Sequence, residues 1–208
     1  LHVPGNNNPL GIDVKTPRDT VPFHPYYTVK DSFYIVCFLI LYAYFVFFAP
    51  EALSSPDNAE PANPLVTPPE IVPEWYFLPF YAILRSIPDK LMGVLSLFAA
   101  LGVLFFVPWL DTSKVRSARF RPVFKQFFWM FVAVCLILGY VGAHAVDATL
   151  LNTGIPLLVI GRIASVCYFA FFLVIMPLVG RYEKPNPLPD SIANSVLSNA
   201  PHRSETAP

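Results

Sequence analysis

The sequence has little charge. Asp, Glu, Lys and Arg make up only 13% of its 208 residues, whereas a soluble domain usually carries about 25%. The 14 acidic and 14 basic side chains also cancel, so the chain has no strong positive field that would favour nucleic acid as a partner. Because 55% of the residues are hydrophobic, the composition indicates a protein that lies in a lipid membrane.

Cysteine and histidine are also scarce. The three cysteines lie singly inside apolar runs, at Cys37, Cys135 and Cys167. Without a CxxC spacing, they are expected to be buried free thiols rather than a disulfide or a metal site. The four histidines are His2, His24, His144 and His202, and none is paired with another at a ligand spacing. We therefore predict that this chain binds no metal ion.

Long runs without charged side chains are what the sequence does have. Four of them are Ser32–Pro50, Leu91–Leu110, Gln126–Ala143 and Ile163–Gly180. Each has about the 17–25 residues that a helix needs to cross a bilayer. None alternates like a strand of an outer-membrane barrel, and backbone in hydrocarbon must satisfy its own hydrogen bonds. The sequence thus predicts an all-α membrane protein with about four transmembrane helices.

The charges at the ends of these runs predict the topology. The second connection carries five cations, Lys114, Arg116, Arg119, Arg121 and Lys125, against one acidic residue. By the positive-inside rule this connection and both ends of the chain face the cytoplasm, and the long loop 51–89 faces the periplasm. We divide the chain into a cytoplasmic-side segment 1–31, a transmembrane domain 32–180 and a cytoplasmic tail 181–208. The Pro, Ser and Asn content of the tail predicts poor order.

The loop 51–89 is the unusual element, because a connection this long inside a compact bundle is usually functional. Many of the chain's 23 prolines lie in it. From Glu74 to Ile87 the pattern becomes compatible with a helix, and Pro79 is expected to bend that helix or mark a break.

Glu74 stands out within this loop, in the segment Pro73-Glu74-Trp75-Tyr76. A carboxylate among aromatic rings at the edge of a bilayer is costly to desolvate, which favours a chemical role. Partial burial is expected to raise the pKa of Glu74 towards the range of a general base that takes a proton from a hydroxyl. Tyr76 and Tyr81 are placed to orient a ring-shaped substrate. The structural alternative is an aromatic belt with a solvent-facing glutamate.

The sixteen residues from Pro73 to Pro88, PEWYFLPFYAILRSIP, closely resemble the quinol-oxidation motif of the cytochrome b family. The resemblance implies a quinol-oxidation site formed by Pro73, Glu74, Trp75, Tyr76, Phe77 and Tyr81. In that site Glu74 is expected to be catalytic, as the acceptor of a proton from quinol.

A second stretch lies on the predicted cytoplasmic side. LHVPGNNNPLG together with HPYYTVKD resembles the quinone-reduction site of the same family. The resemblance implies that His2, Asn6, Phe23, Lys30 and Asp31 line this site, although many relatives have serine in place of Asn6. His2 and Asp31 are expected to be catalytic, delivering protons to the quinone. Taken alone, without the resemblance, Asp31 is better explained as a helix N-cap or first-turn carboxylate.

The resemblance continues through DTSKVRSARFRP and GRIASVCYF, and so covers nearly all of the chain before the tail. Arg162 departs from the family pattern and is expected to snorkel at the periplasmic end of the last helix. Cytochrome b holds two b-type haems through paired histidines of its amino-terminal half, which have no counterpart here. The chain therefore resembles the carboxy-terminal half, and with Leu1 in place of Met we expect a piece of a longer subunit.

The implied function is that of the carboxy-terminal domain of cytochrome b in a ubiquinol:cytochrome c oxidoreductase, inactive as an isolated chain. Ubiquinol and ubiquinone are the implied ligands, in the inner membrane of a bacterium. The implied partners are the amino-terminal half of cytochrome b, a Rieske iron–sulfur protein, cytochrome c1 and membrane lipid, in a dimeric complex.

Two alternatives remain. The first is a subunit IV-type polypeptide of the related photosynthetic plastoquinol complex, which a fourth helix and the region of His2 and Asp31 disfavour. The second is a fragment of a membrane transporter in which Glu74 binds a cation. Transporters tend to place ionisable groups near the bilayer midplane, whereas the apolar runs here are free of charge.

Overall fold

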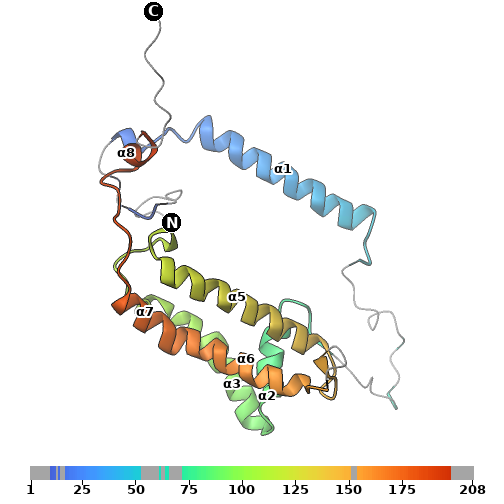
Figure 1. Cartoon of the computed structure of the whole chain (residues 1–208). Coiled ribbons are helices and arrows are strands. Elements are labelled where there is room, and N and C mark those ends of the chain that lie inside the picture. Colours follow the sequence, from blue (N-terminus) through green and yellow to red (C-terminus); the bar gives the residue numbers. More distant parts are fainter. Residues whose placement is uncertain are drawn as a thin grey trace, which may run out of the picture. The chain divides into compact units, whose positions relative to one another are not determined.

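The computed structural model describes residues 10–12, 14, 17–52, 61, 64–65, 72–150 and 154–197. The regular structure of these residues is helical, apart from an isolated antiparallel bridge between Thr149 and Pro156 (Figure 1). The chain divides into two compact units. The first comprises Leu1–Ile12 with Pro69–Leu188, and the second comprises Asp13–Pro68 with Pro189–Pro208.

The second unit contains one membrane-length helix, α1, at Tyr26–Phe47. None of its 22 residues is buried, and a helix that is apolar on every side needs lipid or other helices around it. The unit also contains the 3₁₀ turn η1 at Pro17–Asp19 and the short helix α8 at Ile192–Leu197. Asp19 Oδ1 accepts a hydrogen bond of 2.8 Å from the backbone N–H of Ala193, which caps α8. Part of the tail that was expected to be poorly ordered is therefore helical.

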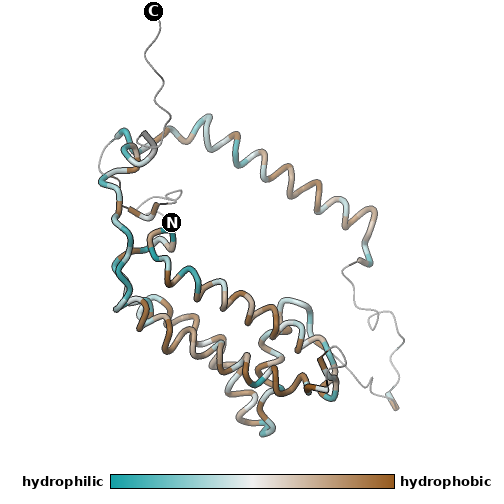
Figure 2. The backbone as a smooth tube through the Cα atoms, in the orientation of Figure 1, coloured by the Kyte–Doolittle hydropathy of each residue, from teal (hydrophilic) through white to brown (hydrophobic). Residues whose placement is uncertain are grey.

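The first unit is a helical bundle. Its helices are α2 (Leu78–Ser86), α3 (Lys90–Phe105), α4 (Val107–Leu110), α5 (Pro122–Ala143), α6 (Leu157–Ala170) and α7 (Met176–Tyr182). A π-helical stretch, η5 (Phe171–Ile175), joins α6 to α7, and a 3₁₀ turn, η3 (Ala118–Phe120), precedes α5. Hydrophobic residues run along the length of α5 and of α6–α7 (Figure 2).

The predicted all-α membrane class is confirmed. In the part of the chain that the structure describes, three helical spans are long and apolar enough to cross a membrane: α1, α5 and the continuous stretch Leu157–Tyr182. The fourth apolar run corresponds to α3, which is shorter at 16 residues, followed by α4. Helix α1 begins at Tyr26 and helix α6 at Leu157, each six residues before the charge-free run that predicted it. Charged side chains are tolerated in the end turns of a membrane helix, so a run without charge understates its length.

A cluster of aromatic rings lies in the core of the bundle, among aliphatic side chains. The ring of Phe131 on α5 stacks on Phe171 at a centroid distance of 4.4 Å and contacts the rings of Tyr168 and Phe172. The Tyr168 hydroxyl donates a hydrogen bond of 3.0 Å to the backbone carbonyl of Ala100 on α3. This buried cluster joins α3, α5 and the π-helical stretch at mid-bundle.

Candidate functional site

The PEWY segment forms the entrance to α2. The backbone N–H of Phe77 donates to the carbonyl of Glu74 at 2.9 Å, and α2 begins one residue later. Pro79 lies in the first turn of α2, where its missing N–H has no helical acceptor to lose. Of the two expectations for Pro79, a bend is wrong and a break holds, because the helix starts at Leu78 rather than at Glu74.

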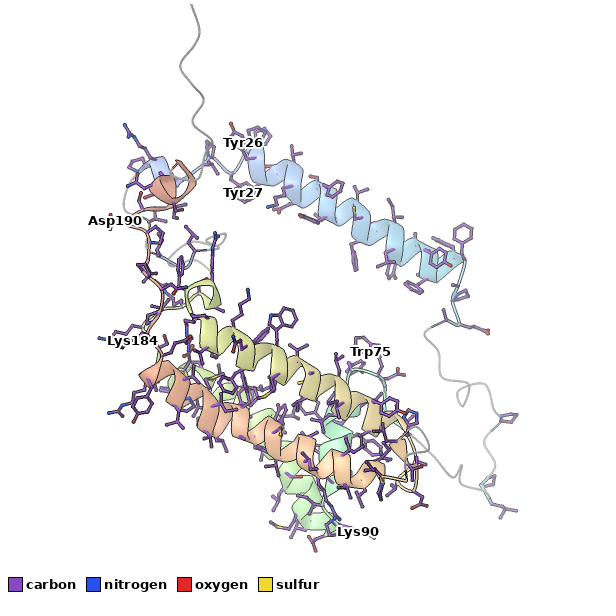
Figure 3. The ribbon with its side chains drawn as sticks, in the orientation of Figure 1. Tyr26, Tyr27, Trp75, Lys90, Lys184 and Asp190 are labelled. Atoms are coloured by element: carbon purple, nitrogen blue, oxygen red, sulfur yellow. The ribbon has the colours of Figure 1, made fainter. Side chains whose placement is uncertain are left out.

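Glu74, Trp75 and Tyr76 lie on the surface of the bundle. Trp75 is 73% exposed and Tyr76 is 63% exposed, and Figure 3 shows the Trp75 side chain at the surface. The two rings meet edge to face at 5.8 Å. Glu74 is also exposed, so the burial expected for its carboxylate is not supplied by the described residues of this chain.

Phe77 and Tyr81 of the predicted quinol site, together with Phe80, form a partly buried aromatic wall at the start of α2. Phe77, Phe80 and Tyr81 are all partly buried. The ring of Phe80 lies 5.7 Å from Phe77 and 6.4 Å from Tyr168 of the core. The exposed PEWY residues are thus continuous with side chains that the bundle holds in place.

Glycines let α2 lie deep among its neighbours α3, α5 and α6. A Cβ atom added at Gly142 of α5 would overlap the carbonyl oxygen of Leu78 and lie 2.9 Å from its carbon. A Cβ at Gly93 of α3 would lie 2.7 Å from the carbonyl oxygen of Leu84. The backbone of α2 therefore touches the backbone of two neighbouring helices, and this contact fixes its depth.

Two arginines hold α2, and neither was among the predicted site residues. Arg85 donates from Nη2 to the carbonyls of Val141 and His144, at 2.6 and 2.9 Å. Arg162 Nε donates to the carbonyl of Ser86 at 3.0 Å. Arg162 is exposed near the start of α6, and its bond to the end of α2 was not part of the expectation that it snorkels. The presence of Arg85 in the apolar stretch FLPFYAILRSIP is the signal that could have identified it.

The second predicted site is only partly described. Phe23 stacks on Tyr27 with ring centroids 6.3 Å apart, and Lys30 and Asp31 are exposed on α1. His2 and Asn6 lie outside the described residues, so their place in this site stays a prediction. Asp31 is neither an N-cap nor a first-turn residue, because the N-cap is Pro25 and the helix begins at Tyr26. The capping interpretation of Asp31 is therefore wrong.

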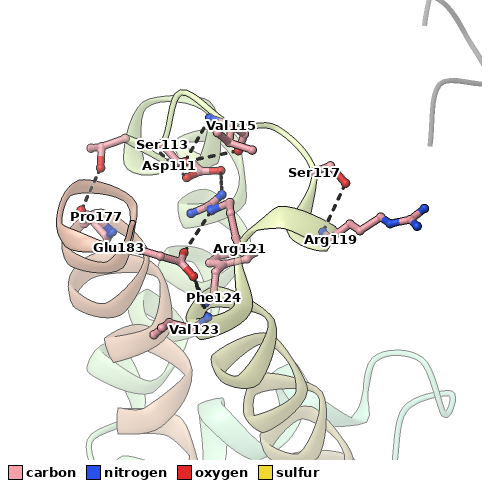
Figure 4. Close-up of polar contacts among 11 residues, drawn as sticks. Asp111, Ser113, Val115, Ser117, Arg119, Arg121, Val123, Phe124, Pro177 and Glu183 are labelled. Atoms are coloured by element: carbon pink, nitrogen blue, oxygen red, sulfur yellow. Dashed lines mark hydrogen bonds and ion pairs between the residues drawn. The ribbon is translucent and has the colours of Figure 1, made fainter. Parts of the chain in front are cut away.

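A buried ion cluster at the other end of α5 was not predicted (Figure 4). Arg121 is 1% exposed, and its Nη1 lies 2.9 Å from Asp111 Oδ2 while its Nε lies 3.5 Å from Glu183 Oε2. Glu183 Oε1 accepts from the backbone N–H groups of Val123 and Phe124, at 2.6 and 3.2 Å. The carboxylate thus caps α5 at its positive end. Arg121 is therefore a structural residue rather than one of the solvated cations.

The described histidines do not fit a haem site. His144 Nδ1 lies 2.8 Å from the carbonyl of Tyr140, and His24 Nδ1 lies 3.3 Å from Thr28 Oγ1. Each lies at one end of its helix, whereas a six-coordinate haem needs two ligands that face each other across the ring. The described part of the chain offers no such pair.

Fold and site together define an all-helical membrane protein in which a short helix between membrane spans displays an acidic and aromatic segment. The family model described as "Cytochrome b(C-terminal)/b6/petD" matches residues 61–169. The chain belongs to the cytochrome b family and corresponds to the carboxy-terminal half of that protein.

Individual relatives agree with this assignment. The chain is 60% identical to cytochrome b of Rhodospirillum rubrum over 200 residues, which is 96% of this chain and 48% of that protein. It is 54% identical to cytochrome b/c1 of Bradyrhizobium diazoefficiens over 198 residues, 95% of this chain and 28% of that protein. A chain of a hyperthermophilic respiratory complex III matches with a TM-score of 0.74 at 38% identity, covering 85% of this chain and 43% of that one. The chain thus spans at most about half the length of these proteins.

Proposed function

We propose that the chain is the carboxy-terminal domain of cytochrome b in a ubiquinol:cytochrome c oxidoreductase of a bacterial inner membrane. Membership of the cytochrome b family carries this proposal. The complex III chain with the same fold supports it. Within the complex, the domain would supply parts of a quinol-oxidation site and of a quinone-reduction site.

At the quinol-oxidation site, Glu74 accepts a proton from a quinol hydroxyl. Oxidation of quinol to quinone releases two protons and two electrons, and the electrons leave to redox groups outside this chain. Phe77 and Tyr81 form the wall against which the quinone ring lies. The exposure of Trp75 and Tyr76 supports a pocket that is completed by other parts of the complex, such as the amino-terminal half of the subunit.

At the quinone-reduction site, His2 and Asp31 supply the two protons that quinone takes up with two electrons. Asn6, Phe23 and Lys30 line this pocket. The sequence resemblance carries this part of the proposal, together with the exposure of Lys30 and Asp31 on α1. Both ends of the chain then face the cytoplasm, and quinol oxidation takes place at the periplasmic face.

The complete complex is the setting in which these sites work. We propose that the Rieske iron–sulfur protein and cytochrome c1 accept electrons from the quinol site, and that the complex is dimeric. The name of the Bradyrhizobium diazoefficiens relative, cytochrome b/c1, supports the partnership with cytochrome c1. Helix α1, which has no buried residue, requires lipid or partner helices along its whole length.

The test of the proposed function is Glu74→Gln in the intact complex. The amide keeps the size of the side chain but cannot accept the proton, so turnover should fall on the order of 10²-fold and the acidic limb of the pH profile should disappear. Steady-state quinol:cytochrome c activity across pH measures both. Glu51→Gln is the matched control, since Glu51 is an exposed glutamate of the same loop outside the motif. A Glu74→Gln complex with the wild-type rate and profile, and with its full haem spectrum, would contradict the role of Glu74.

A further inference from the structure

Arg85 lies in the last turn of α2, on the same helix as the aromatic wall of the proposed quinol site. Its Nη2 atom bonds two carbonyls at the end of α5, those of Val141 and His144. Its guanidinium carbon also lies over the ring of Tyr81, 4.7 Å from the centroid. One side chain therefore touches both a predicted quinol-site residue and the end of a membrane-spanning helix.

The partners of Arg85 are dipoles rather than charges. The last carbonyls of a helix have no partner within the helix and carry partial negative charge, so a cation is favourable there. Among the described residues, no carboxylate forms an ion pair with Arg85, and its buried Nε has no acceptor. The guanidinium is thus held by hydrogen bonds to two carbonyls and by contact with one aromatic face.

Other contacts hold the same end of α2. Ser86 Oγ donates to the carbonyl of Ala82 at 2.7 Å and accepts from Ser165 Oγ at 3.2 Å. Arg162 bonds the carbonyl of Ser86. These contacts tie α2 to α6, whereas Arg85 is the side chain that ties α2 to the end of α5 and also touches Tyr81. Removal of Arg85 should therefore shift Tyr81 without releasing the whole helix.

We propose that Arg85 is a positioning residue of the quinol-oxidation site. By bonding the end of α5 and stacking on Tyr81, it fixes where the aromatic wall stands relative to the PEWY turn. The inference rests on the proposed function. Arg85, which is not one of the six residues that the motif implies, would then help to position the substrate of that site.

The experiment compares Arg85→Met, Arg85→Lys and Arg119→Met in the intact purified complex. Met fills a similar space but donates no hydrogen bond, so the KM for quinol should rise on the order of tenfold, the scale of one charged hydrogen bond. Lys can donate to both carbonyls from its ammonium group and should restore most of the affinity. Arg119 is an exposed arginine at the opposite end of α5, and its replacement should leave the KM unchanged.

Three readouts separate positioning from a merely structural role: the KM and kcat for quinol, the haem spectrum, and the rate of quinone reduction at the opposite face. A raised quinol KM with a normal spectrum and normal quinone reduction supports the proposal. A wild-type KM in Arg85→Met overturns it, and so does an equal loss at both faces that Lys does not restore. If Arg85→Met does not assemble, Arg85→Gln is the second neutral variant, and an unchanged KM there also overturns the proposal.

Glu74→Gln in the same preparations keeps the two hypotheses apart. If Glu74→Gln is impaired and Arg85→Met is normal, the positioning role fails and the proposed function stands. If Glu74→Gln has wild-type activity, the proposed role of Glu74 as the proton acceptor of the quinol site is contradicted.

Discussion

Arg121 and Arg85 lie at opposite ends of α5, and each is held by a different kind of partner. Arg121 precedes the first turn and lies between two carboxylates, those of Asp111 and Glu183. Arg85 meets the last turn of the same helix, and its hydrogen-bond partners among the described residues are backbone carbonyls. One end of the bundle therefore contains a cation between two carboxylates, whereas the other contains a single cation that faces the carbonyls of a helix end.

The difference predicts different costs of removal. A missing Arg121 would leave the side chain of Glu183, which is 3% exposed, without its cation. A missing Arg85 would leave only two carbonyls at a helix end, which water can reach more readily. We therefore expect Arg121 to determine the stability of the bundle and Arg85 to determine the shape of the proposed site.

The largest expected effect is that of Arg121→Met. Breaking a buried ion pair by removing one partner typically costs about 3–5 kcal/mol, because the remaining charge is buried without compensation. The apparent Tm of the purified complex, followed through the haem spectrum, should fall well below that of the wild type. Arg119→Met is the matched control and should change it little. If Arg85→Met lowered the Tm as much as Arg121→Met, the contrast between the two ends would be lost.

Gly142→Ala tests whether backbone contact, as well as Arg85, sets the place of α2. The new Cβ would overlap the Leu78 carbonyl, and overpacking of this kind costs about 1–3 kcal/mol. We expect a lower apparent Tm together with a raised quinol KM, since α2 carries the proposed site. Gly102→Ala is the control, because nothing lies within 4 Å of a Cβ there. If the two alanine variants had the same Tm and the same quinol KM, α2 would be able to move away from the new Cβ without loss of stability.

The same comparison shows how far the sequence could predict the molecule. Runs without charge identify the membrane spans because hydrocarbon excludes charged groups. The PEWY segment stands out because a carboxylate among aromatic rings at the membrane edge is costly to desolvate. Arg121 was indistinguishable from the other cations of its connection, since its partner Glu183 arrives from the end of the last span. The close contact at Gly142 likewise depends on which helices meet. Pairings between distant segments are a tertiary property that local pattern does not contain.

The smallest expected effect lies midway between the two ends, at Tyr168. Its hydroxyl donates to the Ala100 carbonyl, a neutral bond that joins α6 to α3, and Tyr168→Phe removes it while keeping the ring packed on Phe131. The loss should be about 0.5–1.5 kcal/mol, the net value of a typical hydrogen bond. A small decrease in the apparent Tm with unchanged quinol KM and kcat is the expected result. Val166→Ala, at an exposed position of the same helix, controls for general sensitivity of the span. A change in the quinol KM of Tyr168→Phe would mean that the core, through Phe80, also positions the proposed site. The middle of the bundle would then contribute to function as well as the end that contains Arg85.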